Sequence, residues 1–196
     1  MITSLDQLDV SKTYSYADYL KWQFEERVEL IKGKLFKMSP APSRKHQEIA
    51  SLFHGQLYQF LNSQSCQLYF APFDVRLTPR KADKSDKIHT VVQPDICVIC
   101  DRSKLDDKGA IGAPDLIIEI LSPGNSQTEM KNKFEVYEEN GVREYWIVDP
   151  ANEVVWAYIL NDEGRYIGLH PFTLEDELTS HVFPEFKLNV ADIFKD

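Results

Sequence analysis

The segments Gln93-Pro94-Asp95-Ile96-Cys97-Val98-Ile99 and Asp115-Leu116-Ile117-Ile118-Glu119-Ile120-Leu121-Ser122 decide the fold of this chain. Both contain short runs of isoleucine, valine and leucine, which are typical of strands covered on both faces of a sheet. Each segment also carries an isolated acid, Asp95 in the first and Glu119 in the second. Because a buried carboxylate is unfavourable without a partner, the sequence predicts that both acids face a partner.

The two acids converge on one point if their strands are neighbours in the sheet. Carboxylate oxygens that meet at the end of a sheet suit a hard divalent cation such as Mg²⁺. The pattern around Asp95 and Glu119 therefore suggests a metal site of the kind that hydrolyses phosphodiester bonds.

Length and charge limit the possible functions. With 196 residues the chain is expected to form one domain, residues 1–196, with an ordinary hydrophobic core. Its net charge of −9 argues against a protein that coats nucleic acid nonspecifically, because such binding uses clustered lysine and arginine. One candidate basic patch, Arg76 with residues 80–87, is mixed in sign and also fits a solvated loop.

Cysteine content and hydropathy suggest a compartment. Cys97 and Cys100 lie three residues apart on a predicted strand, so their side chains should point to opposite faces, which argues against a zinc site. No N-terminal signal peptide and no apolar run of membrane-spanning length is recognisable. We therefore expect a soluble cytoplasmic protein without membrane contact, whose thiols, Cys66 included, are reduced.

The apolar periodicity and the turn residues predict a compact order of elements. We expect a short helix at 14–22, a hairpin at 26–38, a helix at 43–61, strands at 67–77, 91–99 and 116–122, a helix at 127–140, and strands at 143–148 and 153–160. The central order of helix, three strands, helix and strand indicates an α/β sandwich with a mixed central sheet. Residues 1–42 would form an N-terminal helix and hairpin, 43–150 the core, and 151–196 a C-terminal strand extension.

A series of short motifs carries a resemblance over most of the chain. The motifs are Arg27-Val-Glu29-Leu-Ile-Lys-Gly33, Ser39-Pro-Ala-Pro42, His46, Gln93-Pro-Asp95, Ala113-Pro-Asp-Leu-Ile-Ile-Glu119-Ile-Leu-Ser-Pro123, Lys133 with Tyr137, and Gly141-Val-Arg-Glu144-Tyr-Trp-Ile-Val-Asp-Pro150. In this order and spacing they resemble the bacterial Uma-type family of restriction endonucleases, a branch of the PD-(D/E)XK nuclease superfamily. The resemblance implies a restriction-endonuclease-like three-layer sandwich, a site that uses Mg²⁺ or Mn²⁺, and hydrolysis of phosphodiester bonds in DNA.

The same resemblance implies roles for particular residues. Asp95 and Glu119 would bind the metal together with the backbone carbonyl of Ile120. The lysine that usually follows the Glu by two residues is missing, because Leu121 stands there. Lys133, on the following helix, is expected to replace it as the catalytic lysine.

Helical geometry favours Lys133 over Lys131. Lys133 lies about 60° around the helix from Met130, beside the apolar stripe that Met130 begins, whereas Lys131 lies about 100° away on the other side. The residues alone leave open that Lys133 is a surface lysine whose stem covers apolar area. With the resemblance we predict that Lys133→Ala leaves folding intact and slows the reaction by about 10²-fold or more.

Four further polar residues are candidates for the surroundings of the metal. Glu29 could add an oxygen to the outer shell through water, and His46 could hydrogen-bond a phosphate or cap its helix. Asp74 could add a carboxylate, or could pair with Arg76. Asp115 shares a strand face with Glu119, although an Asp after Pro at the start of a strand more often shapes the turn.

Two other functions stay open on the sequence. A nuclease fold with an inactive site could serve as a DNA-binding or dimerising module, and Leu121 in the lysine position favours this. A glycosidase could use two carboxylates without a metal. If the chain cuts both strands of DNA we expect a homodimer, because such enzymes often work as symmetric dimers.

Overall fold

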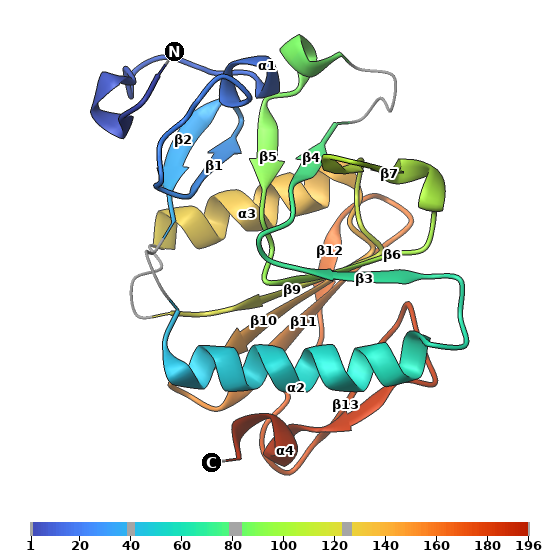
Figure 1. Cartoon of the computed structure of the whole chain (residues 1–196). Helices are drawn as coiled ribbons and strands as arrows, with labels where there is room; N and C mark the ends of the chain where they lie inside the picture. The colour runs from blue at the N-terminus through green and yellow to red at the C-terminus, as the bar shows by residue number, and fades with distance from the viewer. Residues whose placement is uncertain (1, 39–41, 79–83, 123–126, 196) are drawn as a thin grey trace.

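The computed structural model describes residues 2–38, 42–78, 84–122 and 127–195 (Figure 1). Its helices are α1 (Tyr16–Tyr19), α2 (Arg44–Leu61), α3 (Gln127–Asn140) and α4 (Val190–Phe194), with short 3-10 turns at Leu5–Gln7, Ser85–Lys87 and Arg102–Lys104. Its strands are β1 (Val28–Ile31), β2 (Lys34–Lys37), β3 (Gln67–Phe70), β4 (Val75–Leu77), β5 (Thr90–Val92), β6 (Ile96–Ile99), β7 (Leu105–Asp106), β8 (Gly109–Ile111), β9 (Leu116–Ile120), β10 (Glu144–Asp149), β11 (Val154–Leu160), β12 (Tyr166–Gly168), β13 (Glu177–Thr179) and β14 (Lys187–Asn189). Of the predicted motif Ser39-Pro-Ala-Pro42 the structure describes Pro42, and Pro123, the last residue of another motif, lies outside the described residues.

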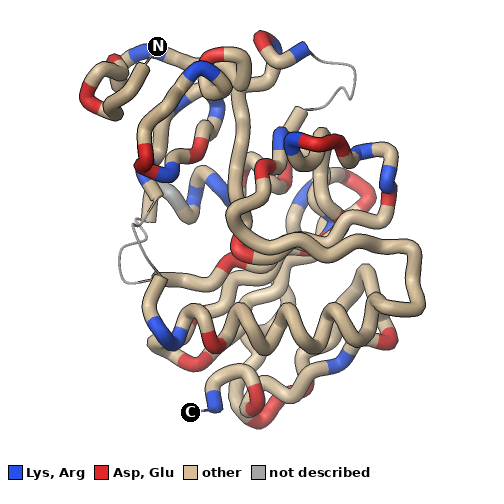
Figure 2. Tube along the Cα trace, viewed as in Figure 1, with Lys and Arg blue, Asp and Glu red and all other residues tan. Residues whose placement is uncertain are grey.

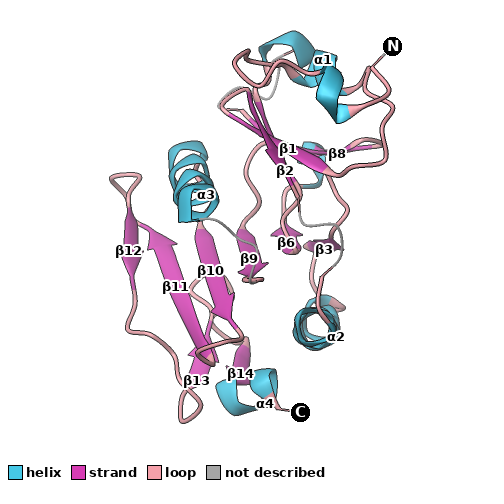
Figure 3. Cartoon of the chain, turned by 90° about the vertical axis from the view of Figure 1, so that its left-hand side faces the viewer, coloured by secondary structure: helices cyan, strands magenta, loops and turns pink. Residues whose placement is uncertain are grey.

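The central sheet has the strand order β12-β11-β10-β9-β6-β3. Its strands β9 and β10 are parallel, and the other neighbouring pairs are antiparallel, so the sheet is mixed. Helices α2 and α3 lie on opposite sides of this sheet (Figure 3). The chain is therefore an α/β protein with the predicted mixed central sheet between helices.

Helix α2 is fixed by its cap and by its apolar face. The Ser43 side chain accepts a hydrogen bond from the His46 backbone N–H, so it caps the start of the helix. Ile49, Phe53 and Leu57 recur at helical spacing and are buried in the core on one side of the central sheet. Burial of each such side chain stabilises the fold by roughly 1.5–3 kcal/mol.

Strand alternation in β9 decides which way its acid points. Leu116, Ile118 and Ile120 are buried in the core on the α2 side, whereas Ile117 is buried in the core on the α3 side. Because neighbouring residues of a strand point to opposite faces, Glu119 shares the face of Ile117 and points toward α3. The pairing of β9 with both β6 and β10 buries this position within the sheet.

A second six-stranded sheet, with the order β2-β1-β5-β4-β8-β7, covers α3 from the other side. This sheet was not predicted: the expected strands at 67–77 and 91–99 each divide into two, β3 with β4 and β5 with β6. Pro72 and Pro94 lie at the two divisions, and proline has no N–H to donate to a strand ladder. Each run therefore leaves one sheet and joins the other, and the predicted hairpin β1–β2 becomes part of the second sheet.

Arg76 does not contribute to the basic surface patch that the sequence suggested. Arg76 is buried, and its guanidinium donates to the backbone oxygen of Ala110 and to the Asp106 carboxylate. Residues 80–83 of the proposed patch lie outside the described ranges. In α2 the charged residues gather in the first turns (Figure 2). No helix within the described ranges is long and apolar enough to cross a membrane.

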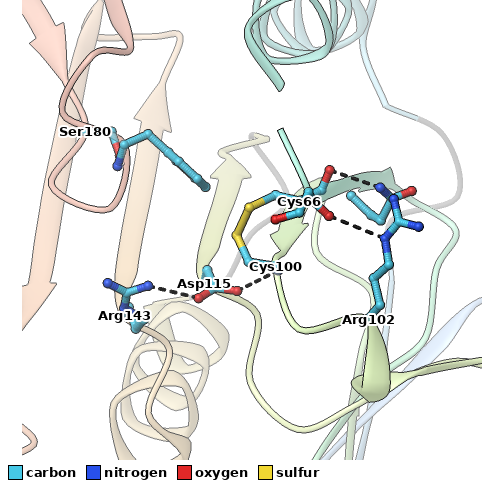
Figure 4. Close-up of a disulfide and its surroundings, with 9 residues drawn as sticks. Cys66, Cys100, Arg102, Asp115, Arg143 and Ser180 are labelled. Carbon is cyan, nitrogen blue, oxygen red and sulfur yellow. Dashed lines mark hydrogen bonds and ion pairs between the residues drawn. A yellow bond between two sulfur atoms is a disulfide. The ribbon is translucent and has the colours of Figure 1, made fainter. Parts of the chain in front are cut away.

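The expectation of three reduced cysteines is wrong, because a disulfide joins Cys66 to Cys100 (Figure 4). In the register of β3 and β6, Gln67 faces Ile99, so the two cysteines just beyond this pair also face each other across the strands. Cys97 points to the opposite face, as predicted, and is the free buried cysteine of the described chain. The disulfide therefore links β3 and β6 covalently at one end of their pairing in the central sheet.

Reduction of this disulfide should lower the free energy of unfolding. The bond links residues 34 positions apart, and the chain-entropy model then gives a loss of about 3–4 kcal/mol in the stability of the reduced protein. Urea unfolding with and without reductant measures the difference. The Cys66→Ser/Cys100→Ser variant is the control, because its stability should not respond to reductant. Equal stability of the oxidised and reduced wild-type chain would contradict the prediction.

Candidate active site

A pocket opens where the N-terminal hairpin, the start of α2 and the end of β9 meet. Its cavity of about 120 Å³ has room for a cation with several waters, since a water needs roughly 10–15 Å³ of such volume. Its lining comes from six parts of the chain: Arg27 and Met38 of the hairpin, Pro42, His46 and Gln47 around the start of α2, Ala71 after β3, Gln93 and Asp95 between β5 and β6, Glu119, Ile120 and Ser122 in and after β9, and Lys133 of α3. The two acids of the sequence motif therefore meet in one cavity.

Asp95 lies at the corner that joins β5 of one sheet to β6 of the other. In the antiparallel register of β6 and β9, Ile96 faces Ile118, which brings Asp95 next to Glu119 across the strands. The Asp95 Oδ2 accepts a hydrogen bond from the Ile120 backbone N–H at 2.8 Å and lies 3.2 Å from the His46 Nε2. These contacts hold one oxygen of the carboxylate in place.

Glu119 is buried and is held by two donors from α3. Its Oε1 accepts a hydrogen bond from the Lys133 Nζ at 3.0 Å and one from the Tyr137 hydroxyl at 2.6 Å. Burial raises the pKa of Glu119 to about 7, against the opposing attraction of the Lys133 ammonium; the charges of Asp95 and Glu29 add to the rise. The negative charges of Asp95 and Glu29 therefore disfavour the ionised form of Glu119.

Lys133 lies between two buried carboxylates. Its Nζ is 3.0 Å from the Glu119 Oε1 and 3.1 Å from the Glu29 Oε1, and Glu29 is fully buried in β1. Burial alone would lower the pKa of Lys133, but the attraction of Glu119 and Glu29 outweighs it and raises that pKa well above its usual range. By contrast, the Lys131 side chain is 77% exposed. The structure thus brings Lys133, and not Lys131, to the acids.

The other four candidates fall in different places. His46 faces Asp95 in the pocket; burial lowers the pKa of His46, but the hydrogen bond and charge of Asp95 raise it overall. Glu29 contacts the site through its ion pair with Lys133. Asp74 lies outside the pocket lining, and burial raises its pKa. Asp115 lies at the other end of β9, where it accepts hydrogen bonds from the Cys100 backbone N–H and from Arg143 (Figure 4).

Asp74 does not pair with Arg76, the alternative that its position suggested. It accepts a hydrogen bond from the Gln93 side-chain amide at 2.9 Å and one from the Tyr19 hydroxyl at 3.3 Å. The Gln93 backbone N–H in turn donates to the Glu29 Oε1 at 2.7 Å. Asp74 therefore contacts the site only through Gln93.

The structure adds three residues to the site for which the sequence predicted no role. Tyr137 appeared in the motif that pairs it with Lys133, and its spacing of four residues from Lys133 places both side chains on one helix face. Arg27 and Gln93 appeared only as parts of motifs. No local sequence signal predicts their contact, because they are 66 residues apart.

The donor set fits a divalent cation. No residue in the described part of the chain donates a hydrogen bond to the Asp95 Oδ1 or to the Glu119 Oε2, so each acid keeps one oxygen for a ligand. Within the described residues no cluster of three or more His, Cys, Asp or Glu side chains is placed to hold a metal. A cation here would therefore rest on two carboxylates and would need backbone carbonyl or water oxygens to complete its shell.

Known proteins share this architecture. Residues 16–191 match the Uma2 family, described as "Putative restriction endonuclease". The chain belongs to the Uma2 family. This match confirms the family that the motifs resemble.

Two known proteins are similar to this Uma2 chain. The "Uncharacterized protein slr1290" of Synechocystis sp. (strain ATCC 27184 / PCC 6803 / Kazusa) is 22% identical over 156 residues, which cover 78% of this chain and 77% of that protein. A crystal structure of "a putative nuclease belonging to DUF820" from Anabaena variabilis ATCC 29413 superposes with a TM-score of 0.72 at 23% identity, covering 92% of this chain and 97% of the other. The second likeness establishes the fold.

The position of Lys133 changes what its removal should do. The Lys133→Met variant would leave Glu29 and Glu119 buried without a cation between them, so we expect the free energy of unfolding to fall by about 3–5 kcal/mol. This prediction differs from the expectation on the sequence alone that Lys133→Ala leaves folding intact. Urea unfolding of this Uma2 protein measures the change.

Tyr137→Phe is the matched control for Lys133→Met. It removes a neutral donor from the same Glu119 oxygen and should cost less, about 1.5–3 kcal/mol, the range for a hydrogen bond to a charged group. Equal losses in the two variants would show that charge compensation by Lys133 does not stabilise the fold.

Proposed function

We propose that this Uma2 protein is a Mg²⁺-dependent endonuclease that hydrolyses phosphodiester bonds in DNA. The observation that carries the proposal is the meeting of Asp95 and Glu119 in one pocket, each with one oxygen that no described residue occupies. The family description and the nuclease-like fold agree with this chemistry. Mn²⁺ should substitute for Mg²⁺, because both cations accept carboxylate and water oxygens.

In the proposed mechanism Asp95, Glu119 and the backbone carbonyl of Ile120 would hold the cation. When bound, Mg²⁺ supplies Lewis-acid polarisation of a phosphate oxygen and lowers the pKa of water at the site. The Ile120 N–H holds one oxygen of Asp95, and the Lys133 ammonium holds one oxygen of Glu119. The second oxygen of each acid is left for the ligand.

Lys133 has a second part in the proposed reaction. Its ammonium lines the pocket and is buried, so its charge acts in a medium of low dielectric constant. A cation held in advance near a phosphate stabilises the negative charge that develops on the phosphoryl oxygens. His46, 3.2 Å from the Asp95 carboxylate, limits the rotation of that side chain.

Removal of either acid should nearly abolish cleavage. We expect Asp95→Asn and Glu119→Gln to reduce the Mg²⁺-dependent nicking of supercoiled plasmid by about 10²-fold or more, because each variant loses a charged metal ligand. EDTA should abolish the wild-type activity. Asp115→Asn is the control on the same strand, since its side chain contacts Cys100 and Arg143 outside the pocket. Full activity of Asp95→Asn would refute the assignment.

Metal binding separates the proposed enzyme from an inactive binding module. Addition of Mn²⁺ should raise the melting temperature of the wild-type chain and leave that of Asp95→Asn unchanged, because a ligand that binds only the folded state stabilises it. Stabilisation by Mn²⁺ without cleavage of any plasmid would indicate the module. Cleavage that resists EDTA would indicate hydrolysis without a metal.

We also propose that the active species is a homodimer. A duplex has two antiparallel strands, and a two-fold axis presents one site to each of them. Analytical ultracentrifugation with and without a DNA duplex tests this proposal.

A further inference from the structure

We infer that Arg27 binds a backbone phosphate of the substrate strand next to the phosphate that is cleaved. The site lies between the catalytic pocket and a second groove that adjoins it along the N-terminal hairpin. The inference rests on the proposed nuclease function, because it assigns to the groove the same nucleic-acid strand. Arg27 would bind a phosphate that neither the motif acids nor Lys133 contacts.

The two cavities adjoin at the hairpin and share two lining residues. Arg27 and Met38 line both the catalytic pocket and the second groove, so a chain that leaves the acids on this side passes these two residues. The groove further contains Phe24, Glu25, Glu26 and Lys37. In the hairpin register Val28 faces Lys37, and the Met38 N–H donates to the Arg27 carbonyl, so backbone hydrogen bonds fix this junction.

Arg27 is the cation of this junction, and no acid in the described chain neutralises it. Its Nε and Nη2 donate to the Gln93 Oε1 at 3.3 and 2.8 Å, and no carboxylate of the described residues forms an ion pair with it. The other cation of the pocket, Lys133, by contrast contacts two acids. An arginine held by a neutral amide keeps its full charge for an anionic ligand.

Gln93 holds the guanidinium in a defined orientation. Its Nε2 donates to Asp74 and its Oε1 accepts from Arg27, so the amide can adopt only one of its two orientations. Its backbone N–H donates to Glu29, and Asp95 follows two residues later. The guanidinium is thus held by the same corner that carries the catalytic acid. A planar fork set in advance suits the oxygens of a phosphate.

The rest of the groove limits the contact to about one phosphate. Glu25 and Glu26 are exposed in the groove and repel a polyanion, which offsets the attraction of Lys37. Phe24 offers an apolar ring that stacks on Trp22 with ring centroids 5.7 Å apart, and such a ring can contact a sugar or a base without regard to sequence. We therefore expect a local, sequence-independent contact and not a long basic track.

The test is binding of a fluorescein-labelled DNA duplex in Ca²⁺, measured by anisotropy over a range of salt concentrations. Arg27→Gln should weaken binding about tenfold or more, and it should reduce the slope of log affinity against log salt by about one. Arg27→Lys should keep the slope and lose part of the affinity, because it retains the charge without the fork. Arg102→Gln is the matched control: it removes an exposed arginine far from the groove and should change neither quantity.

A measurement of Mn²⁺ binding distinguishes the loss of a phosphate contact from a disturbance of the fold. Arg27→Gln should keep the thermal stabilisation by Mn²⁺, since Arg27 is not among the proposed ligands. An unchanged affinity and salt slope in Arg27→Gln overturns the inference, and so does loss of the Mn²⁺ response, which would make Arg27 a structural residue. Failure of the wild-type chain to bind Mn²⁺ or to cleave would instead overturn the proposed nuclease function, whereas the comparison of DNA binding would still decide the role of Arg27.

Discussion

The contact of Lys133 with Glu29 and Glu119 is the interaction on which the rest of the site depends. It joins three elements at one ammonium: β1 of the second sheet, β9 of the central sheet, and α3 between them. Either carboxylate alone in this buried position would carry a large desolvation cost. The contact therefore sets the rotation of α3, and through it the position of Tyr137 beside the same Glu119 oxygen.

The corner from Gln93 to Asp95 couples the two sheets to the chemistry. The Gln93 backbone donates to Glu29 in one sheet, whereas Asp95 accepts from the Ile120 backbone in the other. The Asp95 carbonyl also accepts from the Ala71 N–H, which lies at the second crossing between the sheets. A site at this corner contains polar groups from both sheets. The short connections between the sheets hold these groups in place, so no long loop is needed.

Glu144 shows what a purely architectural buried acid looks like in the same fold. Both of its oxygens are occupied, Oε1 by the Trp146 indole and the His181 N–H, and Oε2 by Ser180 and the Val182 N–H. These bonds tie the C-terminal extension to β10. Asp95 and Glu119 differ because only one oxygen of each is occupied by described residues. Incomplete satisfaction of two neighbouring acids is the physical distinction between a ligand site and a structural anchor.

The sequence by itself determined the helices that flank the central sheet and the strand-forming runs next to Asp95 and around Glu119, because apolar period and helix caps are local signals that the chain carries in order. The place of Lys133 beside the stripe begun by Met130 followed from helical spacing in the same way. That Asp95 lies beside Glu119 followed only from the register of β6 and β9. Only the tertiary structure decided that two predicted strands cross into a second sheet, that Cys66 joins Cys100, and that Lys133 also meets Glu29. It also decided that Arg27 lies beside Gln93. These contacts join residues far apart in the chain, and what selects them is the pairing of whole sheets, which no local pattern of residues encodes.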